Sequence, residues 1–298
     1  MKVTNISKKK FDDLEKIELT GRALGTEGEM FILTFPNGKE KVLKRLYSSE
    51  GLTFANKLYT LEMLDVYREY IPEYFILPDS LVSIGRRIEA FTCNKVEGEN
   101  LSNILYNPKI SSSEQLRLLK QVGNIIEQMA YIRKNTPLKD FYLNDLHEAN
   151  FMVSSKTGQV HPIDLDGCKI ANNKTFASKY LSPYSLFNET ELTKYEINKD
   201  TESPGYIVPN EDSELYCYSM CILNYLLGDN INNFKLEKFY EYLYYLETIG
   251  INRELLNSFE ILVTNSPNVN PSNYLASITQ EQVAKAKNKI FKLKTQKK

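Results

Sequence analysis

The sequence predicts an α+β protein in which a sheet-forming half precedes a helical half. Three observations lead to this prediction. Up to about residue 93, short apolar runs alternate with polar residues and are separated by turns, which is typical of antiparallel strands. From about residue 111 onward, apolar residues recur at helical spacing. With 298 residues, 42% of them hydrophobic, the chain is long enough to bury a large core and to form two lobes.

The boundary between the halves falls in the polar stretch from Asn94 to Leu101, where a lone glycine suits a hinge. We therefore expect a first lobe over residues 1–96 and a helical lobe over residues 97–278. Residues 279–298 are expected to form a lysine-rich helix or tail. A solvated surface explains its lysines better than binding to a membrane or to nucleic acid.

The first lobe should contain five strands and one helix. Residues 16–35 predict two strands joined by a glycine-containing connector, and residues 40–47 predict a third strand. An amphipathic helix is expected over residues 51–70. Its apolar stripe consists of Phe54, Leu58, Leu61 and Leu64. Two further strands should cover residues 80–84 and 87–93.

Two features of this lobe are compatible with phosphate binding. The glycine connector includes Gly25 and Gly28, and glycines let backbone N–H groups approach phosphate oxygens because no Cβ intervenes. Lys44 lies on the third strand and shares a face with Val42 and Leu46. Such a lysine either extends to water or meets an anion. Taken singly, a plain hairpin and a solvated lysine are the better explanations.

Helices dominate the second half. A capping box at Ser111–Glu114 begins a helix that continues to Ile132. Two later helices are expected over residues 236–249 and 253–263, and the first of them has Gly250 as its C-cap.

Residues 214–227 predict a helix that is apolar nearly all round, which indicates a buried helix. Asp212 or Ser213 is expected to cap it. The preceding residues, 168–211, are polar and irregular, and a loop of this length within a compact domain is usually functional or mobile.

The stretch from Tyr142 to Gly167 contains the strongest chemical signal. Asp145 and Asn150 stand five residues apart before a short apolar strand, and Asp164 follows the second strand of the same hairpin. Mg²⁺ prefers a few hard oxygen ligands and keeps its other positions for phosphate and water. A separate carboxylate must face the attacking hydroxyl. The hairpin therefore predicts phosphoryl-transfer chemistry.

Composition argues against several other classes of protein. The formal net charge of −1 gives no indication of nucleic acid or a membrane as the main partner. No apolar run approaches the roughly 20 residues of a transmembrane span, and the N-terminus lacks the apolar core of a signal peptide. The cysteines are interpreted as reduced thiols of a cytoplasmic protein. They are Cys93, Cys168, Cys217 and Cys221.

In their order along the chain, these motifs resemble the protein-kinase-like fold. That resemblance implies a bilobal α+β molecule with an antiparallel-sheet N-lobe and a mainly helical C-lobe. The matching segments are Gly25–Gly28, Val42–Lys44, Asp145–Asn150, Asp164–Asp166 and the helix that begins at Glu214.

The resemblance implies that ATP binds in the first lobe. Lys44 would bind the α- and β-phosphates and pair with Glu62, while Gly25 and Gly28 would cover the phosphates. Backbone groups of two hinge residues would bind adenine, with Cys93 at the back of the pocket. These hinge residues are Asn94 and Val96.

It also implies the catalytic and metal-binding residues. Asp145 would orient the acceptor hydroxyl and take its proton, and Asn150 and Asp164 would hold Mg²⁺. Asp166 stands where the family has a glycine, which leaves open whether Asp164 or Asp166 is the principal metal ligand. Asp164 is favoured because it directly follows the strand.

Two departures from the family pattern bear on function. Leu143–Asn144 replaces the usual His-Arg pair, so control by a phosphorylated activation loop is not expected. His147 gives the loop a D-L-H-x-x-N form that is similar to aminoglycoside and choline phosphotransferases.

The function expected is that of an ATP- and Mg²⁺-dependent kinase acting on protein serine or threonine. A small-molecule kinase acting on an alcohol is the first alternative. A pseudokinase that acts as a scaffold is the second, although a scaffold would not need the lysine, both aspartates and the asparagine together.

Overall fold

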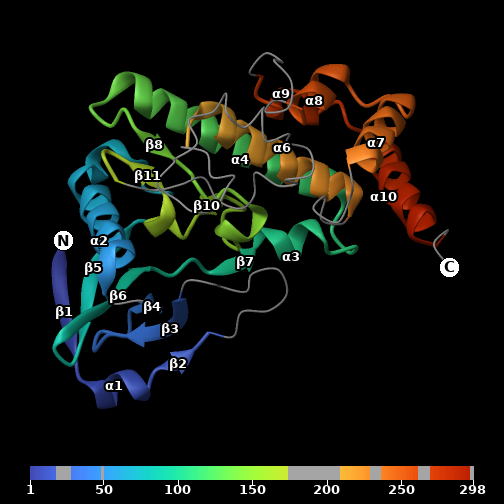
Figure 1. Cartoon of the computed structure of the whole chain (residues 1–298). Coiled ribbons are helices and arrows are strands. Elements are labelled where there is room, and N and C mark those ends of the chain that lie inside the picture. Colours follow the sequence, from blue (N-terminus) through green and yellow to red (C-terminus); the bar gives the residue numbers. More distant parts are fainter. Residues whose placement is uncertain (18–27, 48–49, 174–208, 229–235, 261–268, 296–298) are drawn as a thin grey trace. The chain divides into compact units, whose positions relative to one another are not determined.

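The computed structural model describes the chain except for residues 18–27, 48–49, 174–208, 229–235, 261–268 and 296–298 (Figure 1). The chain divides into two compact units. The first comprises residues 1–102, 132–141 and 149–174, and the second comprises residues 103–131, 142–148 and 175–298. The first unit therefore combines the sheet-forming N-terminal region with two stretches from further along the chain.

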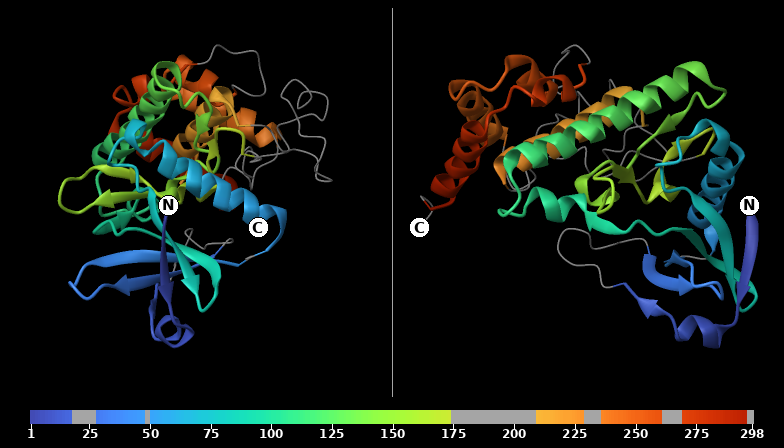
Figure 2. Two further views of the ribbon diagram at one scale, coloured as in Figure 1. Left: turned by 90° about the vertical axis from the view of Figure 1, so that its left-hand side faces the viewer. Right: turned by 180° about the vertical axis from the view of Figure 1, so that it is seen from behind.

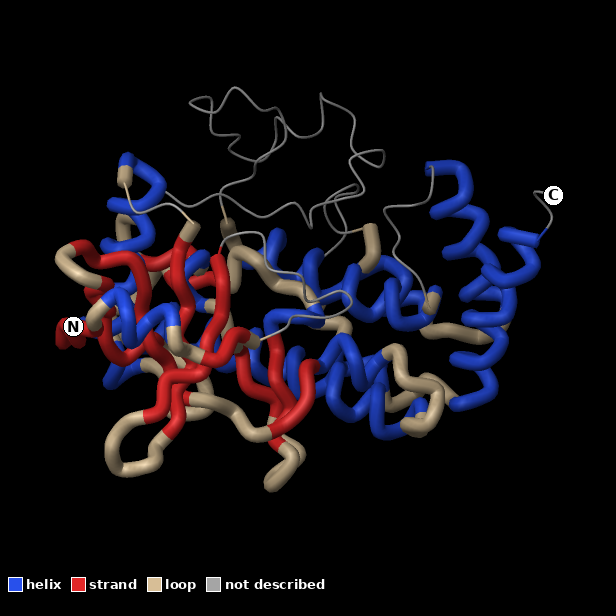
Figure 3. Tube along the Cα trace, turned by 90° about the horizontal axis from the view of Figure 1, so that it is seen from below, coloured by secondary structure: helices blue, strands red, loops and turns tan. Residues whose placement is uncertain are grey.

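A six-stranded sheet forms the centre of the first unit, and Figure 3 shows its strands in red. In spatial order they are β1 (Lys2–Ile6), β5 (Pro78–Ile84), β6 (Arg87–Asn94), β4 (Glu40–Leu46), β3 (Gly28–Thr34) and β2 (Glu15–Lys16). β1 pairs with β5 in parallel, and the other neighbours pair antiparallel. The strands predicted over residues 40–47, 80–84 and 87–93 are confirmed as β4, β5 and β6.

The sequence did not predict β1 or the short helix that follows it. Of the five residues of β1, only Ile6 is buried, so the strand lacks the apolar alternation by which strands are recognised. The helix after it is capped by Ser7, whose side chain accepts a hydrogen bond from the backbone N–H of Lys10. The helical segments of the N-terminal region are α1 (Lys8–Asp12), α2 (Gly51–Val66) and a 3₁₀ turn (Arg68–Tyr70).

Alternate residues of β4 face two different apolar clusters. Leu43 belongs to a cluster with Phe31 of β3, whereas Leu46 belongs to a cluster with Leu61 of α2. Figure 2 shows α2 lying over one face of the sheet. Since side chains alternate along a strand, Lys44 shares the face of Leu46 and points to the side that α2 covers. The predicted alternation along this strand is therefore confirmed.

Two glycines are required because a neighbouring backbone comes too close for a side chain. A Cβ on Gly28 would lie 2.3 Å from the carbonyl oxygen of Arg45 on β4. A Cβ on Gly98 would lie 1.9 Å from the carbonyl oxygen of Val153. Both glycines therefore permit strand pairing.

The other strands of the described residues form two smaller sheets. β7 (Gly98–Asn100), β9 (Phe151–Ser154) and β10 (Val160–Pro162) form one, with β9 in the middle. β8 (Phe141–Tyr142) and β11 (Lys169–Ile170) form the other. The hairpin expected between Tyr142 and Gly167 is confirmed as β9 and β10.

The rest of the chain is mainly helical. The helices are α3 (Leu101–Leu105), α4 (Ser112–Asn135), α6 (Glu211–Leu227), α7 (Leu236–Thr248), α8 (Arg253–Ser258), α9 (Ser272–Leu275) and α10 (Gln280–Thr295). α4 and α6 lie side by side (Figures 1 and 2), and the Tyr218 hydroxyl donates a hydrogen bond of 2.8 Å to the carbonyl of Leu119. Among the described residues, no helix combines the length and the apolar character that a membrane crossing requires.

Helix α6 is buried along nearly its whole length, as its all-round apolar sequence predicts. Its cap differs from the prediction. Asn210 accepts from the backbone N–H of Ser213, while the Ser213 hydroxyl accepts from the backbone N–H of Asn210. Asp212 and Ser213 therefore lie inside the first turn rather than at the N-cap position. The helix ends at Leu227, and its C-cap residue Gly228 adopts φ 66°.

Helix α8 ends at Ser258 instead of continuing to residue 263, and residues 261–268 lie outside the described part of the chain. Most of the irregular stretch predicted over residues 168–211 also lies outside it, as does Gly25.

Candidate active site

The β9–β10 hairpin brings the segments that flank it together. Phe151 pairs with Pro162, and the next residue along, Ile163, donates its backbone N–H to the carbonyl of Asn150 at 2.9 Å. Asp164 follows with φ 61° and ψ 42° in the left-handed region, a conformation that costs a non-glycine residue about 1–2 kcal/mol. The sequence predicts Asn150 and Asp164 at the two ends of the hairpin, and the structure brings these ends together.

Lys44 is a buried cation of the first unit. Its side chain is only 6% exposed, and its ammonium donates hydrogen bonds to Asp164 and, at 2.9 Å, to Asp166. Burial alone would lower the pKa of Lys44. The carboxylates of Asp164 and Asp166 outweigh burial and raise this pKa above its usual range, so Lys44 stays charged.

Asp166 is almost completely enclosed, with 1% of its side chain exposed. One carboxylate oxygen accepts from Lys44, and the other accepts from Lys57 of α2 at 2.8 Å. Burial alone would raise the pKa of Asp166, but the ammonium groups of Lys44 and Lys57 hold it well below its usual range. Asp166 is therefore an ionised counterion for two lysines.

Asp164 has a different environment. About a quarter of its side chain, 24%, is exposed. Burial raises the pKa of Asp164 to about 6, and the Lys44 ammonium offsets only part of this rise because Asp166 adds to it. The more accessible of the two carboxylates is thus that of Asp164.

These surroundings fit a magnesium ion better at Asp164 than at Asp166. Among the described residues, no group of three or more His, Cys, Asp and Glu side chains could hold a metal. Mg²⁺ does not need such a group, because it binds through one or two protein oxygens together with phosphate and water. The Asn150 amide and the Asp164 carboxylate offer hard oxygens of this kind, whereas both oxygens of Asp166 are engaged by lysines.

The predicted pairing of Lys44 with Glu62 is wrong. Glu62 lies on the exposed side of α2, and Lys44 is paired with Asp164 and Asp166 instead. The residue of α2 that joins the cluster is Lys57, one turn before the buried Leu61.

Lys57 was not predicted, because the resemblance implies an acidic partner for Lys44 on this helix. The position of Lys57 in the helical repeat could have indicated it. Lys57 lies three residues after Phe54 and four before Leu61, so it occupies the apolar face of the helix.

A second contact joins α2 to the segment after β10. The buried amide of Asn173 donates 2.8 Å hydrogen bonds to the Thr60 hydroxyl and to the carbonyl of Cys168, and its oxygen accepts from the backbone N–H of Ile170 at 3.1 Å. This contact and the Lys57–Asp166 pair hold α2 against the residues that follow the hairpin.

The loop that contains Asp145 lies in the second unit and is held by two buried glutamates. Glu214 of α6 accepts from the backbone N–H of Leu143 at 2.8 Å, and Glu148 accepts from the Tyr106 hydroxyl at 2.9 Å. Asp145 itself is 43% exposed, and its carboxylate lies 3.4 Å from Nε2 of His147. The loop is therefore fixed at both ends while its aspartate remains accessible.

The remaining predicted positions that the structure describes lie on or next to strands of the first unit. Asn94, the last residue of β6, is exposed and pairs with Lys41, and Val96 is half-buried two residues later. Cys93 lies beside Val42 on β4, and burial raises the pKa of its thiol to about 12. The backbone carbonyl of Arg45 lies so close to Gly28 that a glycine is required at this position even if no ligand binds there.

No protein-family model matches the sequence, and no curated protein matches it either. Among solved structures, one described as an apo pseudokinase is similar to this chain, with a TM-score of 0.51. The likeness covers 97% of this chain and 97% of the other at 11% sequence identity. At this identity the likeness shows the fold alone. The chain has a protein-kinase-like fold with a sheet-rich N-terminal region and a helical C-terminal part, as the sequence predicted.

Proposed function

We propose that the chain is an ATP- and Mg²⁺-dependent phosphotransferase that transfers the γ-phosphate to a hydroxyl group, with protein serine or threonine as the acceptor. The observation that supports this best is the pairing of Lys44 with Asp164 at the end of the hairpin where Asn150 also lies. Phosphoryl transfer requires a cation for the phosphates and hard oxygens for a metal. These three residues supply both within the first unit.

In this proposal Lys44 changes partners when the nucleotide binds. Its ammonium leaves Asp164 for phosphate oxygens and keeps its hydrogen bond to Asp166, which Lys57 holds in the charged state. Asp164 is then free to act as a ligand together with Asn150. Asn150 and Asp164 would hold Mg²⁺, whose positive charge would offset the negative charge of the phosphates.

Asp145 is the proposed acceptor of the proton from the attacking hydroxyl. Its exposed carboxylate can reach an acceptor group, and the Glu214 and Glu148 contacts fix the backbone on which it stands. Positioning of this kind is the main contribution that a protein makes to phosphoryl transfer.

A small-molecule alcohol is the second candidate acceptor. The observation that favours it is the contact between His147 and Asp145, since the D-L-H-x-x-N form of this loop resembles small-molecule phosphotransferases. A scaffold without chemistry remains the outcome to be distinguished by experiment.

The test follows labelled phosphate from ATP in the presence of Mg²⁺. The purified chain is incubated alone, with casein as a protein acceptor, and with choline or an aminoglycoside as a small-molecule acceptor. We expect transfer to protein. Asp145→Asn should lower turnover by about 10²- to 10⁴-fold, the usual contribution of a positioned acid–base group, while ATP still binds.

The control variant is Asp140→Asn, which changes an aspartate that is 51% exposed and 3.5 Å from Lys169. It should leave transfer unchanged. Unaltered transfer by Asp145→Asn would contradict the role of Asp145. Binding of ATP without transfer to any acceptor would favour the scaffold.

A further inference from the structure

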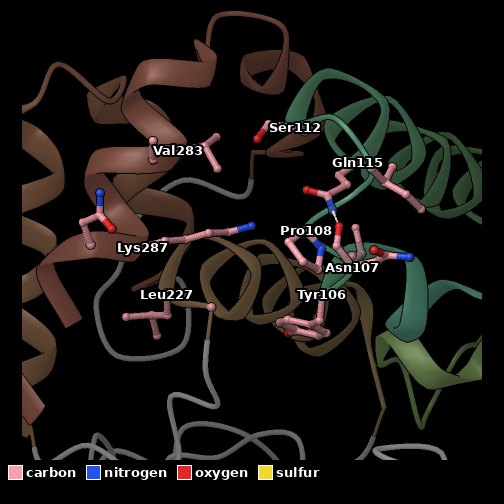
Figure 4. Close-up of a pocket in the computed structure, with 13 residues that line it drawn as sticks. Tyr106, Asn107, Pro108, Ser112, Gln115, Leu227, Val283 and Lys287 are labelled. Carbon is pink, nitrogen blue, oxygen red and sulfur yellow. Dashed lines mark hydrogen bonds between the residues drawn. The ribbon is translucent and has the colours of Figure 1, made fainter. Parts of the chain in front are cut away.

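A pocket of about 580 Å³ lies within the second unit (Figure 4). Three parts of this unit form its walls: the connection between α3 and α4, the end of α6 at Leu227 and Gly228, and one face of α10. Its volume falls within the roughly 300–1,000 Å³ range of small-molecule sites.

The lining is apolar on several sides and contains no acid. Leu105, Pro108, Ile110, Leu227 and Val283 supply aliphatic surface. None of the thirteen lining residues is an aspartate or a glutamate. Within the described part of the chain, the pocket therefore has no anionic group of its own.

One lysine enters this pocket. Lys287 of α10 extends across it toward Asn107 and Pro108 (Figure 4). Its ammonium lies 4.1 Å from the centre of the Tyr225 ring, a cation–π contact. The residue is half-buried, and no carboxylate of the described residues lies within ion-pair distance of it.

The surroundings of Lys287 differ from those of its neighbour Lys285. Lys285 is exposed and pairs with Glu281 at 2.6 Å. Burial lowers the pKa of Lys287, and no carboxylate in the described part of the chain offsets this effect. A partly desolvated ammonium that lies against an aromatic ring gains from an added anion.

A structural role at the end of α6 accounts for only part of this side chain. The carbons of Lys287 lie beside Gly228, where the C-terminal end of a helix favours a cation. That contact involves the aliphatic stem, because the atoms near Gly228 are Cγ and Cδ. The ammonium itself reaches further, into the pocket.

The other polar groups define the wall of the pocket. Gln115 donates to the carbonyls of Ile104 and Asn107 at 2.9 and 3.0 Å, which fixes the loop on one side. Ser112 lies in the first turn of the 24-residue helix α4, where backbone N–H groups lack intrahelical acceptors and negative charge is favoured.

We propose that this pocket binds a small amphipathic anion, whose carboxylate or phosphate group pairs with Lys287 while its apolar body lies against Leu105, Leu227 and Val283. The inference is independent of the proposed phosphotransfer, because every residue involved lies in the second unit and outside the catalytic loop.

The test measures binding of octanoate to the full-length chain by titration calorimetry. Octanol supplies the apolar body without the charge, and inorganic phosphate supplies the charge without the apolar body. Saturable octanoate binding is expected, with octanol and phosphate each binding at least about tenfold more weakly. Equal binding of phosphate and octanoate would mean an anion site without an apolar component and would overturn the proposal.

Variants then locate the binding. Lys287→Gln should weaken octanoate binding by about tenfold or more, whereas the matched control Lys285→Gln on the same helix should leave it unchanged. Ala284→Phe fills the pocket from an exposed position and should abolish binding with Lys287 still present. If both Lys287→Gln and Ala284→Phe are folded by circular dichroism and bind octanoate like the natural chain, the proposal is wrong.

Discussion

Asp166 shows how a charge can be buried deeply in this protein. A carboxylate removed from water needs compensation from charge and hydrogen bonds, or it becomes protonated. Lys44 and Lys57 compensate it from opposite oxygens at 2.9 and 2.8 Å. Lys44 also contacts Asp164, the residue proposed to bind the metal. The charge on Asp166 is therefore linked to Asp164 through Lys44.

Replacing Lys57 tests this link. In Lys57→Met, Asp166 loses one of these two lysines and keeps Lys44, which should then be held more tightly and be less available to phosphate. We expect the free energy of unfolding to fall by about 2 kcal/mol, the scale of a hydrogen bond to a charged group, and the affinity for ATP and Mg²⁺ to weaken. Denaturant unfolding and nucleotide titration measure the two effects.

Glu62→Gln is the control on the same helix, since Glu62 is exposed and lies outside the cluster. It should change neither quantity appreciably. If Glu62→Gln weakened nucleotide binding while Lys57→Met did not, the partner on α2 would be the one that the sequence first suggested.

At the scale of elements, the sequence predicts a helix or strand where its own residues form a recognisable pattern, and it does not predict contacts between distant segments. α4 was predicted because its apolar residues recur at helical spacing, and α6 because its sequence is apolar nearly all round. β4 and β6 were predicted as short runs with apolar residues between turn residues. β1 was missed because it is a mostly exposed edge strand, and its pairing with β5 joins residues almost 80 positions apart. The Lys57–Asp166 contact spans 109 positions, and no local pattern in a single sequence encodes it.

The pairing of β7 with β9 requires a residue without a side chain at position 98. A Cβ at residue 98 would lie 1.9 Å from the carbonyl oxygen of Val153, a separation that backbone atoms cannot relieve without moving the strands apart. Gly98→Ala should therefore destabilise the chain by several kcal/mol, which is the range for forced backbone shifts and lost pairing. Thermal and denaturant unfolding would measure the loss.

Gly167 provides the matched control. It follows the aspartate pair, and a Cβ there would meet nothing within 4 Å. Gly167→Ala should leave stability within about 0.5 kcal/mol. A Gly98→Ala variant as stable as Gly167→Ala would mean that the β7–β9 register is not required for the fold.

At the scale of the whole chain, the fold tolerates almost complete change of sequence. The solved pseudokinase structure shares the fold over 97% of both chains with 11% identity. Buried positions require apolar residues of suitable volume more than particular residues, so the same architecture can be formed by very different sequences. Likeness of fold therefore leaves activity to be argued from Lys44, Asp145, Asn150 and Asp164 themselves.

The rise in the Tm of the whole chain on addition of nucleotide reports nucleotide binding and does not depend on phosphate transfer. A ligand that binds only the folded chain stabilises it by about 2.7 kcal/mol at 100 times its Kd. ATP with Mg²⁺ should therefore raise the Tm of the natural chain and of Asp145→Asn equally, because Asp145 is assigned to proton transfer. Lys44→Met and Asp164→Asn should abolish the rise, since their side chains are assigned to the phosphates and the metal. Loss of the rise in Asp145→Asn, or its survival in both Lys44→Met and Asp164→Asn, would contradict this division of roles between the aspartates and the lysine.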